Sequence, residues 1–365
     1  MGMHATPPLP RRPDIRALTG LRGVAACWVM VGHYFAADTP WPTLTLVISH
    51  SYIAVDLFMI LSGFVLAMSY GATLQTPNAA SVGRYVWQRL ARIYPLYATT
   101  TLICWGLIKS GIPVWGNPTA SAAGLAANLL LVQIWGWPND SLNAAAWSIS
   151  GEWAASLLFP IFAIAFFRGR WRWSAFAAAL VFLLLAAAAL RSGEVGEPWA
   201  GAVGWYNHFP FALLRCIAAF VFGVFAFRLR SLPCATSLGS TPALAVILLL
   251  IAPLLPFYAA DLVLIPLATL LVIGLSFERS AIARALGTPK LHWLGLISYS
   301  IYLWQMPVLP LRPALTALLA GADTLATLLL MAVVIAVAAL SYRYLERPAQ
   351  SWLRKLAERR AKARA

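Results

Sequence analysis

The sequence predicts an all-α membrane protein, a polytopic bundle of about ten transmembrane helices. Of its 365 residues 61% are hydrophobic and only 11% are charged, and the mean hydropathy is +0.75. The apolar residues gather in runs that are long enough to cross, or nearly cross, a hydrocarbon core of about 30 Å. This composition lies far outside that of soluble domains and places the chain in the helical membrane class.

Ten apolar runs follow one another along the chain, and each is expected to form one spanning helix. In order, they cover residues 17–36, 51–70, 93–108, 147–167, 173–190, 209–227, 242–257, 262–277, 293–311 and 322–343. An eleventh segment, residues 120–134, is apolar but short and lies between Pro118 and Pro138. It is expected to be re-entrant or interfacial, with a tilted short helix as the alternative.

The distribution of positive charge decides the role of this short segment. If the segment crosses the membrane, Arg168, Arg170 and Arg172 fall outside; if it dips in and returns, they fall inside with the other Lys and Arg clusters. The external connections then contain few basic residues and hold Asp38, Glu194, Glu197, Asp261 and Asp323. The asymmetry predicts ten crossings and two cytoplasmic termini.

The chain is expected to form one membrane domain, residues 16–348, between a cytoplasmic segment, 1–15, and a basic cytoplasmic tail, 349–365. Because Asp14 and Arg22 interrupt the early region, no cleavable signal peptide is convincing and the first run is interpreted as a retained span. The net charge of +15 lies in short clusters between apolar runs and in the tail. This pattern is typical of cytoplasmic loops and not of nucleic-acid binding.

Arg22 and His33 are two ionisable residues within the first predicted span. Such side chains are costly in a bilayer, so two on one apolar segment indicate a site. A separation of eleven residues returns to within about 20° of the same helix face and rises about 16 Å. One face therefore carries a cation near one end and a titratable imidazole further in.

An outer group of polar residues is expected around His33. Asp56 lies just inside the second span, and Ser148 and Glu152 follow the start of another span at Trp147. Because these segments enter or leave on the same side, His33, Asp56 and Glu152 are expected to meet in the outer half of the bundle. A carboxylate beside an imidazole supports a general base. The structural alternatives are a satisfied core histidine and an aspartate that caps its helix.

An inner group is expected at the cytoplasmic boundary. Arg89 and Arg92 are three residues apart, so they lie on one helix face as a forked cationic patch, and Arg22 sits near the same side. Such a patch suits the phosphates of a nucleotide-containing donor. The alternative is that these arginines satisfy only the positive-inside rule.

Two later segments also carry polar residues beside predicted spans. Residues 298–305 are polar and aromatic, and they either line a cavity or make interhelical hydrogen bonds. The stretch from Tyr344 to Pro348 ends the last span and is interpreted as a helix stop with an interfacial ion pair. The four cysteines lie mostly in apolar runs without the spacing of metal ligands, so neither a metal nor a disulfide is expected.

Taken together, these motifs resemble the acyltransferase-3 family of integral membrane acyltransferases. They follow the order of the family and cover almost the whole chain. The matching segments are residues 15–23 followed by His33, then 54–64, 89–97, 146–153, 295–304 and 346–348. At one position many members carry a histidine where this chain has Gln305, which leaves His33 as the better base candidate.

The resemblance implies transfer of an acyl group, commonly acetyl, from a cytoplasmic acyl-CoA to a hydroxyl of a saccharide or glycoconjugate. His33 is then the general base or a transient acyl carrier, helped by Glu152 or Asp56. The donor is expected to bind Arg22, Arg89 and Arg92. Substrate contacts are expected from Trp147, Ser148 and Tyr299.

The expected partners are therefore acyl-CoA, a carbohydrate acceptor and membrane lipid, and the expected location is the bacterial cytoplasmic membrane. The rival class is a transporter or flippase, in which the embedded charges bind a solute or relay protons. It predicts movement of a substrate without release of CoA. A non-catalytic scaffold is a third possibility. The sequence leaves the acceptor, the acyl-chain length and the oligomeric state open.

Overall fold

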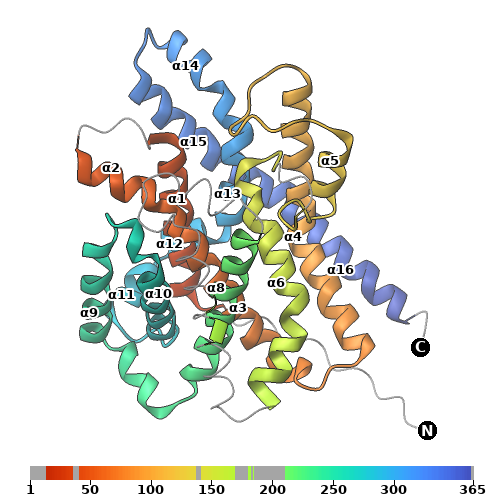
Figure 1. The fold of residues 1–365 in the computed structure, drawn as a ribbon, viewed down its shortest axis with the longest axis vertical. Coiled ribbons are helices and arrows are strands. Elements are labelled where there is room, and N and C mark those ends of the chain that lie inside the picture. Colours follow the sequence, from red (N-terminus) through yellow and green to blue (C-terminus); the bar gives the residue numbers. More distant parts are fainter. Residues whose placement is uncertain are drawn as a thin grey trace.

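The computed structural model describes residues 14–35, 41–136, 141–168 and 210–362, with three further positions, Leu180, Val181 and Leu184. Within these residues every regular element is a helix and no strand occurs. The all-α prediction is therefore confirmed. Figure 1 shows the longer helices side by side, most of them running roughly along the long axis of the molecule.

The helices of the first half are α1 (Arg16–Phe35), α2 (Pro42–Ser49), α3 (Ile53–Leu74), α4 (Ala79–Lys109), α5 (Ala122–Leu129) and α6 (Trp147–Ala163). Those of the second half are α8 (Phe211–Arg230), α9 (Thr241–Ile251), α10 (Asp261–Leu275), α11 (Ala281–Leu286), α12 (Pro289–Leu296), α13 (Ser298–Val308), α14 (Arg312–Leu318), α15 (Asp323–Ser341) and α16 (Arg347–Lys362). Short turns connect or extend them, among which η1 (His50–Tyr52), η2 (Ala144–Ala146) and the π-helical η9 (Tyr342–Glu346) border the polar clusters described below.

Five described helical stretches are long and apolar enough to cross a membrane: Pro42–Leu74, Ala144–Arg168, Phe211–Arg230, Tyr258–Leu275 and Asp323–Ala357. Two bent pairs raise this number to seven if each pair is one span: Pro233–Gly239 with Thr241–Leu254, and Pro289–Leu296 with Ser298–Leu318. The sequence predicts ten spans. Apart from three positions, the predicted span 173–190 lies outside the described residues.

The first and third predicted spans are helices that do not reach the same apolarity. They correspond to α1 and to the second half of α4, neither of which is among the candidate spans. α1 carries Arg22 and His33, and α4 carries three consecutive threonines before Leu102. Neither helix has the composition of a candidate membrane span, although both are packed into the bundle.

The short segment 120–134 forms α5, which has only eight residues. The side chain of Ser121 caps its start by accepting a hydrogen bond from the amide of Gly124 at 2.9 Å. A helix of this length rises about 12 Å, whereas the hydrocarbon core is about 30 Å thick. A straight helical crossing over this segment is therefore excluded.

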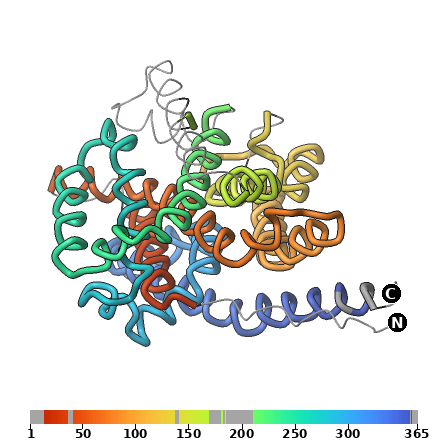
Figure 2. The backbone as a smooth tube through the Cα atoms, turned by 90° about the horizontal axis from the view of Figure 1, so that it is seen from below, coloured from red at the N-terminus to blue at the C-terminus, as the bar shows by residue number. Residues whose placement is uncertain are grey.

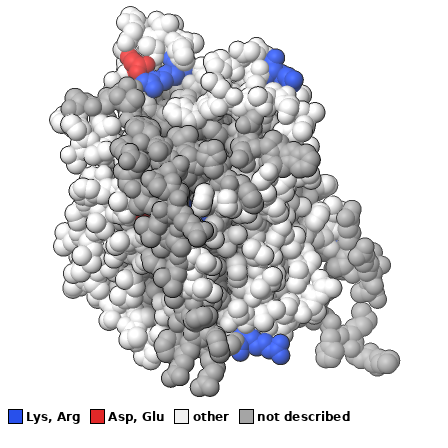
Figure 3. Space-filling view, viewed as in Figure 1, with Lys and Arg blue, Asp and Glu red and all other residues white. Residues whose placement is uncertain are grey.

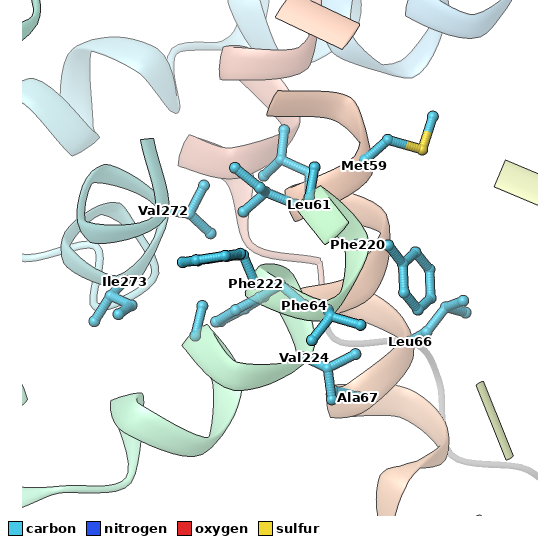
Figure 4. Close-up of a cluster of buried hydrophobic side chains, with 14 of the residues drawn as sticks. Met59, Leu61, Phe64, Leu66, Ala67, Phe220, Phe222, Val224, Val272 and Ile273 are labelled. Carbon is cyan, nitrogen blue, oxygen red and sulfur yellow. The ribbon is translucent and has the colours of Figure 1, made fainter. Parts of the chain in front are cut away.

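The α3–α8 contact forms the centre of the bundle and depends on two glycines. A Cβ atom on Gly63 would lie 2.1 Å from the carbonyl oxygen of Phe220, and one on Gly223 would lie 2.0 Å from that of Ile60. Only glycine allows two helix backbones to approach so closely. Figure 4 shows the apolar side chains around this contact, from α3, α8 and α10, which form the largest hydrophobic cluster.

Two prolines inside helices free a backbone carbonyl that a side chain from elsewhere then binds. The carbonyl four residues before Pro160 of α6 accepts a hydrogen bond from the Tyr85 hydroxyl at 2.8 Å. In α13, Pro307 frees the carbonyl of Leu303, which accepts from Asn143 Nδ2 at 3.0 Å. Burial raises the pKa of the Tyr85 hydroxyl, so this group stays a neutral donor.

The C-terminal helix continues where a stop was expected. The last span passes through the π turn η9 directly into α16, so the predicted helix stop from Tyr344 to Pro348 is wrong, whereas Glu346 does form an ion pair, with Arg92. Proline is tolerated there because the π turn just before it departs from the α-helical hydrogen-bond pattern. α16 then runs out along one side of the bundle in Figure 2, and Trp87 of α4 donates to the carbonyl of Leu353 at 2.8 Å.

Charged residues are sparse among the described atoms on the face that Figure 3 shows. On the face in Figure 3 the blue and red atoms lie at the two ends of the long axis, and the described atoms between them are nearly all white. Several large apolar side chains of α9 and α15 are exposed, including Leu249 at 72% and Leu340 at 58%. An apolar belt of this kind suits a lipid environment.

Candidate functional site

His33 is half-buried in the last turn of α1, next to α13. Its Nδ1 lies 3.1 Å from Oε1 of Gln305, and its ring centroid lies 6.1 Å from that of Trp115. The next residue, Tyr34, donates from its hydroxyl to the backbone carbonyl of Gln305 at 2.8 Å. Two hydrogen bonds therefore tie the end of α1 to residue 305.

Along α13, Tyr302 lies one turn before Gln305 and extends the polar path towards α6. Gln305 Nε2 donates to the carbonyl of Tyr302 at 2.8 Å. The Tyr302 hydroxyl in turn lies 2.8 Å from Oγ of Ser148. Both side chains are buried. These contacts connect Ser148 to His33 indirectly, through Tyr302 and Gln305 of α13.

Glu152 follows one turn later in α6 and forms an ion pair with Arg89 of α4. The same carboxylate accepts from the Ser62 hydroxyl of α3 at 2.7 Å. The side chains of Arg89 and Glu152 are 8% and 18% exposed, so the pair is largely withdrawn from solvent. Arg22 of α1 also interacts electrostatically with Glu152. This carboxylate thus lies among cations of the predicted inner group.

Arg92 turns to a different acidic partner. Its Nη1 lies 2.9 Å from Oε2 of Glu346 in η9, and the Ser300 hydroxyl donates to the other oxygen of that carboxylate. The guanidinium lies 5.3 Å from the centroid of the Tyr299 ring, whose hydroxyl donates to the carbonyl of Ile93 at 2.7 Å. The predicted fork of two arginines is present, but each arm pairs with a glutamate from another element.

The structure does not bring His33, Asp56 and Glu152 together. Among the described residues, His33 has Gln305 and Trp115 as its polar and ring partners and no carboxylate. Arg89 neutralises Glu152, and Asp56 binds an arginine of its own. The expected meeting in the outer half is corrected in this respect, because in a low-dielectric interior a permanent cation is the stronger partner for a carboxylate.

The arginine that binds Asp56 is Arg215 of α8, which is not among the residues predicted from the sequence. Its Nε and Nη2 lie 2.9 and 2.6 Å from the two carboxylate oxygens, in a forked arrangement. Its Nη1 lies 2.6 Å from Asp261 Oδ2, and Asp261 Oδ1 lies 2.6 Å from His50 Nε2. The available signal was an arginine within an apolar run, which is as unusual as the histidine of α1.

The structure therefore separates the predicted residues into three clusters, defined as the His33 cluster (His33, Tyr34, Trp115, Tyr302, Gln305), the arginine–glutamate cluster (Arg22, Ser62, Arg89, Arg92, Glu152, Tyr299, Ser300, Glu346) and the Arg215 cluster (His50, Asp56, Arg215, Asp261). Ser148 borders the His33 cluster through the hydroxyl of Tyr302, and Trp147 packs against the main hydrophobic core. In the described part of the chain no group of three His, Cys, Asp or Glu side chains is arranged to hold a metal ion.

A hollow opens between the end of α3 and the start of α4. Its lining residues on α4 come shortly before Arg89 of the arginine–glutamate cluster in the sequence. The hollow has a volume of about 240 Å³ and includes Tyr70, Arg84 and Tyr85 in its lining. Tyr85 interacts electrostatically with Arg89. The hollow thus gives the arginine-bearing end of α4 a surface depression beside a further arginine.

Comparison with known proteins gives a match over most of the chain. The acyltransferase-3 family model, described as an acyltransferase domain, matches residues 15–343. Over 168 residues the chain is 35% identical to Acyltransferase MdmB of Streptomyces mycarofaciens, which covers 42% of this chain and 40% of that protein. Over 83 residues it is 42% identical to Protein 2 in picA locus of Rhizobium radiobacter, covering 22% of this chain and 38% of that protein.

The matched segments thus span about two fifths of the length of each of these two relatives. No solved structure matches the chain.

Proposed function

Because the chain belongs to the acyltransferase-3 family, we propose that it moves an acyl group from acyl-CoA to a hydroxyl of a saccharide or glycoconjugate at the membrane. Membership in this family supports an acyltransferase activity, and the candidate spans fit an integral membrane protein. The donor, the acceptor and the roles of individual residues are our proposal.

One observation carries the proposal: the two ends of α1 lie in different chemical surroundings. The Arg22 end interacts with the arginine–glutamate cluster, which contains several cations. The His33 end contacts an uncharged amide and an exposed indole. The phosphates of a donor need cations, which the Arg22 end has nearby, and a neutral sugar hydroxyl needs an uncharged site, which the His33 end has. One donor molecule can extend from the first site to the second.

For the donor, Arg92 is the best placed of the paired arginines. Its side chain is 28% exposed, whereas that of Arg89 is 8% exposed. A phosphate competes well for a guanidinium because charge-assisted bidentate bonds are strong. We assign Arg92 and Arg22 to the donor phosphates, and we assign Arg89 to holding Glu152 in place beside them.

For the chemistry, His33 is the proposed general base. Its Nε2 takes the proton of the acceptor hydroxyl while the hydroxyl oxygen attacks the thioester carbonyl carbon. A C–O bond forms and the C–S bond breaks, and the imidazolium returns the proton to the departing sulfur to give free CoA. A transient acyl group on His33 is the alternative route, and it would release CoA before any acceptor is added.

For the acceptor we propose Trp115, in addition to the predicted substrate contacts Trp147, Ser148 and Tyr299. Its indole is 49% exposed and lies beside the His33 imidazole. Ser148 and Tyr299 already make hydrogen bonds inside the bundle. An exposed aromatic face beside the proposed base is a suitable platform for the acceptor, because indole combines a large apolar area with a polar edge.

His33→Ala tests the proposal, with His292→Ala as the matched control. His292 pairs with Asp14 at the surface, 2.7 Å away, and belongs to none of the three clusters. Membranes containing each variant at equal abundance receive radiolabelled acetyl-CoA and an envelope glycan fraction, and label transfer and free CoA are measured. We expect His33→Ala to lose at least about 100-fold of transfer, the usual lower range for a general base.

His292→Ala should keep normal transfer. Full transfer by His33→Ala would overturn the catalytic assignment, and movement of glycan without any release of CoA would favour the transporter class instead.

A further inference from the structure

We infer that Gln305 is the positioning residue for His33: its amide holds the imidazole with the hydrogen on Nδ1 and leaves Nε2 free to accept a proton. The inference rests on the proposed function and names the group that prepares its base. It is carried by two hydrogen bonds of one buried side chain, to His33 and to the backbone of Tyr302.

The orientation of the amide follows from its second partner. A side-chain amide has one acceptor oxygen and one donor nitrogen, and a backbone carbonyl can only accept. The atom of Gln305 that lies 2.8 Å from the Tyr302 carbonyl must therefore be the NH₂ group. If the amide were turned by 180°, two acceptor oxygens would face each other in a buried site, which is costly.

The tautomer of His33 follows from this orientation. With its nitrogen engaged, Gln305 presents Oε1 to His33 Nδ1 at 3.1 Å, and this oxygen needs a donor. The Nδ1 atom must then carry a hydrogen, so in the neutral ring Nε2 has the lone pair. A general base needs this arrangement, and neighbouring groups select it in His-dependent enzymes through an oriented carboxylate or a side-chain amide.

The backbone of α13 holds this amide in place. The Tyr34 hydroxyl donates to the Gln305 carbonyl, and Asn143 binds the carbonyl that Pro307 frees. The backbone carbonyls of Gln305 and of Leu303, two residues before it, are thus anchored to other elements. A positioning group must itself be fixed if it is to fix its partner.

The choice of an uncharged partner also has a consequence for the base. Among the described residues, the groups that face the imidazole are the Gln305 amide from α13 and the Trp115 indole from the loop after α4, and neither is charged. A carboxylate in this place would favour the protonated ring. The amide orients the ring without holding a proton on Nε2.

Three substitutions separate positioning from packing. Gln305→Met keeps the length of the side chain but removes the acceptor. Gln305→Glu keeps an acceptor for His33 but removes the donor to Tyr302. Gln305→His retains one donor and one acceptor. Gln133→Met is the matched control, because Gln133 is equally buried and also donates to a backbone carbonyl, that of Ala146, but has no histidine partner.

The assay again uses radiolabelled acetyl-CoA with an envelope glycan fraction, and kcat and KM for acetyl-CoA are determined at equal protein abundance. We expect Gln305→Met to lower kcat about 10- to 100-fold, as is usual when the partner of a functional side chain is lost, with KM unchanged within about twofold. Gln305→His should recover most of kcat. Gln305→Glu should recover only part of it, because the carboxylate favours the protonated ring and has no donor for the Tyr302 carbonyl. Gln133→Met should keep the parent kcat.

Normal kcat in Gln305→Met, when His33→Ala is inactive, would overturn the inference and leave the proposed function intact. Equal losses in the Met, Glu and His variants would also overturn it, because they would indicate packing alone. If Gln305→Met does not accumulate, Gln305→Asn replaces it, because the Asn side chain is one methylene shorter and its amide cannot reach His33. The same loss of kcat in Gln305→Asn supports the inference. A normal kcat contradicts it. An active His33→Ala would instead refute the assignment of the base.

Discussion

At the scale of single residues, the two arginines of α4 show why spacing alone does not fix a role. Arg89 and Arg92 share a helix face, as their spacing requires. Arg89 is nevertheless buried against Glu152, whereas Arg92 is partly exposed against Glu346. The same chemical group therefore supports the fold at one position and is available to a ligand at the other.

Arg92→Met should raise the KM for acetyl-CoA about 10-fold, the effect of losing roughly 1.4 kcal/mol of charge-assisted phosphate binding, with kcat largely kept. Lys290→Met, at an exposed position on α12, is the control and should leave KM unchanged. Steady-state kinetics with varied acetyl-CoA measure both. An unchanged KM in Arg92→Met would remove this arginine from the donor site.

Arg89→Met should act mainly on stability. It leaves the Glu152 carboxylate in the bundle with only Arg22 nearby, and breaking a buried pair from one side costs about 3–5 kcal/mol. Adding Glu152→Gln should recover part of the loss, because the uncompensated charge disappears. Thermal unfolding of the detergent-solubilised variants measures the effect, and equal unfolding temperatures for Arg89→Met and the parent would contradict it.

At the scale of elements, helix existence was predictable and helix contacts were not. Each predicted span within the described residues is largely helical, because long apolar runs have no other stable conformation in lipid, although the span 293–311 is divided between α12 and α13, which are bent by 59°. The sequence could not indicate that α3 and α8 meet at Gly63 and Gly223, since glycines in apolar segments are common and only the partner backbone makes them necessary.

Gly63→Ala should destabilise the bundle by about 1–3 kcal/mol, the usual range for overpacking, since the new Cβ would overlap the Phe220 carbonyl. Gly83→Ala is the matched control within α4, because a Cβ added there would have no neighbouring atom within 4 Å. The control should be neutral or stabilising, as alanine is the better helix former. Thermal unfolding compares the two, and a loss of stability in the control alone would refute the argument.

At the scale of the whole molecule, the Arg215 cluster connects three helices and a turn. Asp56 comes from α3, Arg215 from α8 and Asp261 from α10, and His50 of η1 completes the set. His50 Nδ1 also faces the carbonyl of Leu255 at 2.7 Å, so both ring nitrogens face acceptors.

Arg215→Leu should be among the most destabilising single changes, because it leaves both Asp56 and Asp261 without their shared cation. The free energy of unfolding should fall by about 3–5 kcal/mol, as for a buried ion pair broken from one side. Asp56→Asn in the same background should recover part of this loss. Thermal unfolding and the yield of folded protein measure it. Measured alone, Asp56→Asn with normal kcat would also remove Asp56 as a helper of the base.

The sequence by itself determined that this protein is an all-α membrane acyltransferase-family chain, and it singled out His33, Arg22, Arg89, Arg92 and Glu152. It could do so because hydrophobic runs and costly embedded charges are local properties. Only the tertiary structure decided which partner each charge has: Gln305 for His33, Arg89 for Glu152 and Arg215 for Asp56. Pairing depends on which helix faces meet, and that is set by the packing of side chains far apart in the chain.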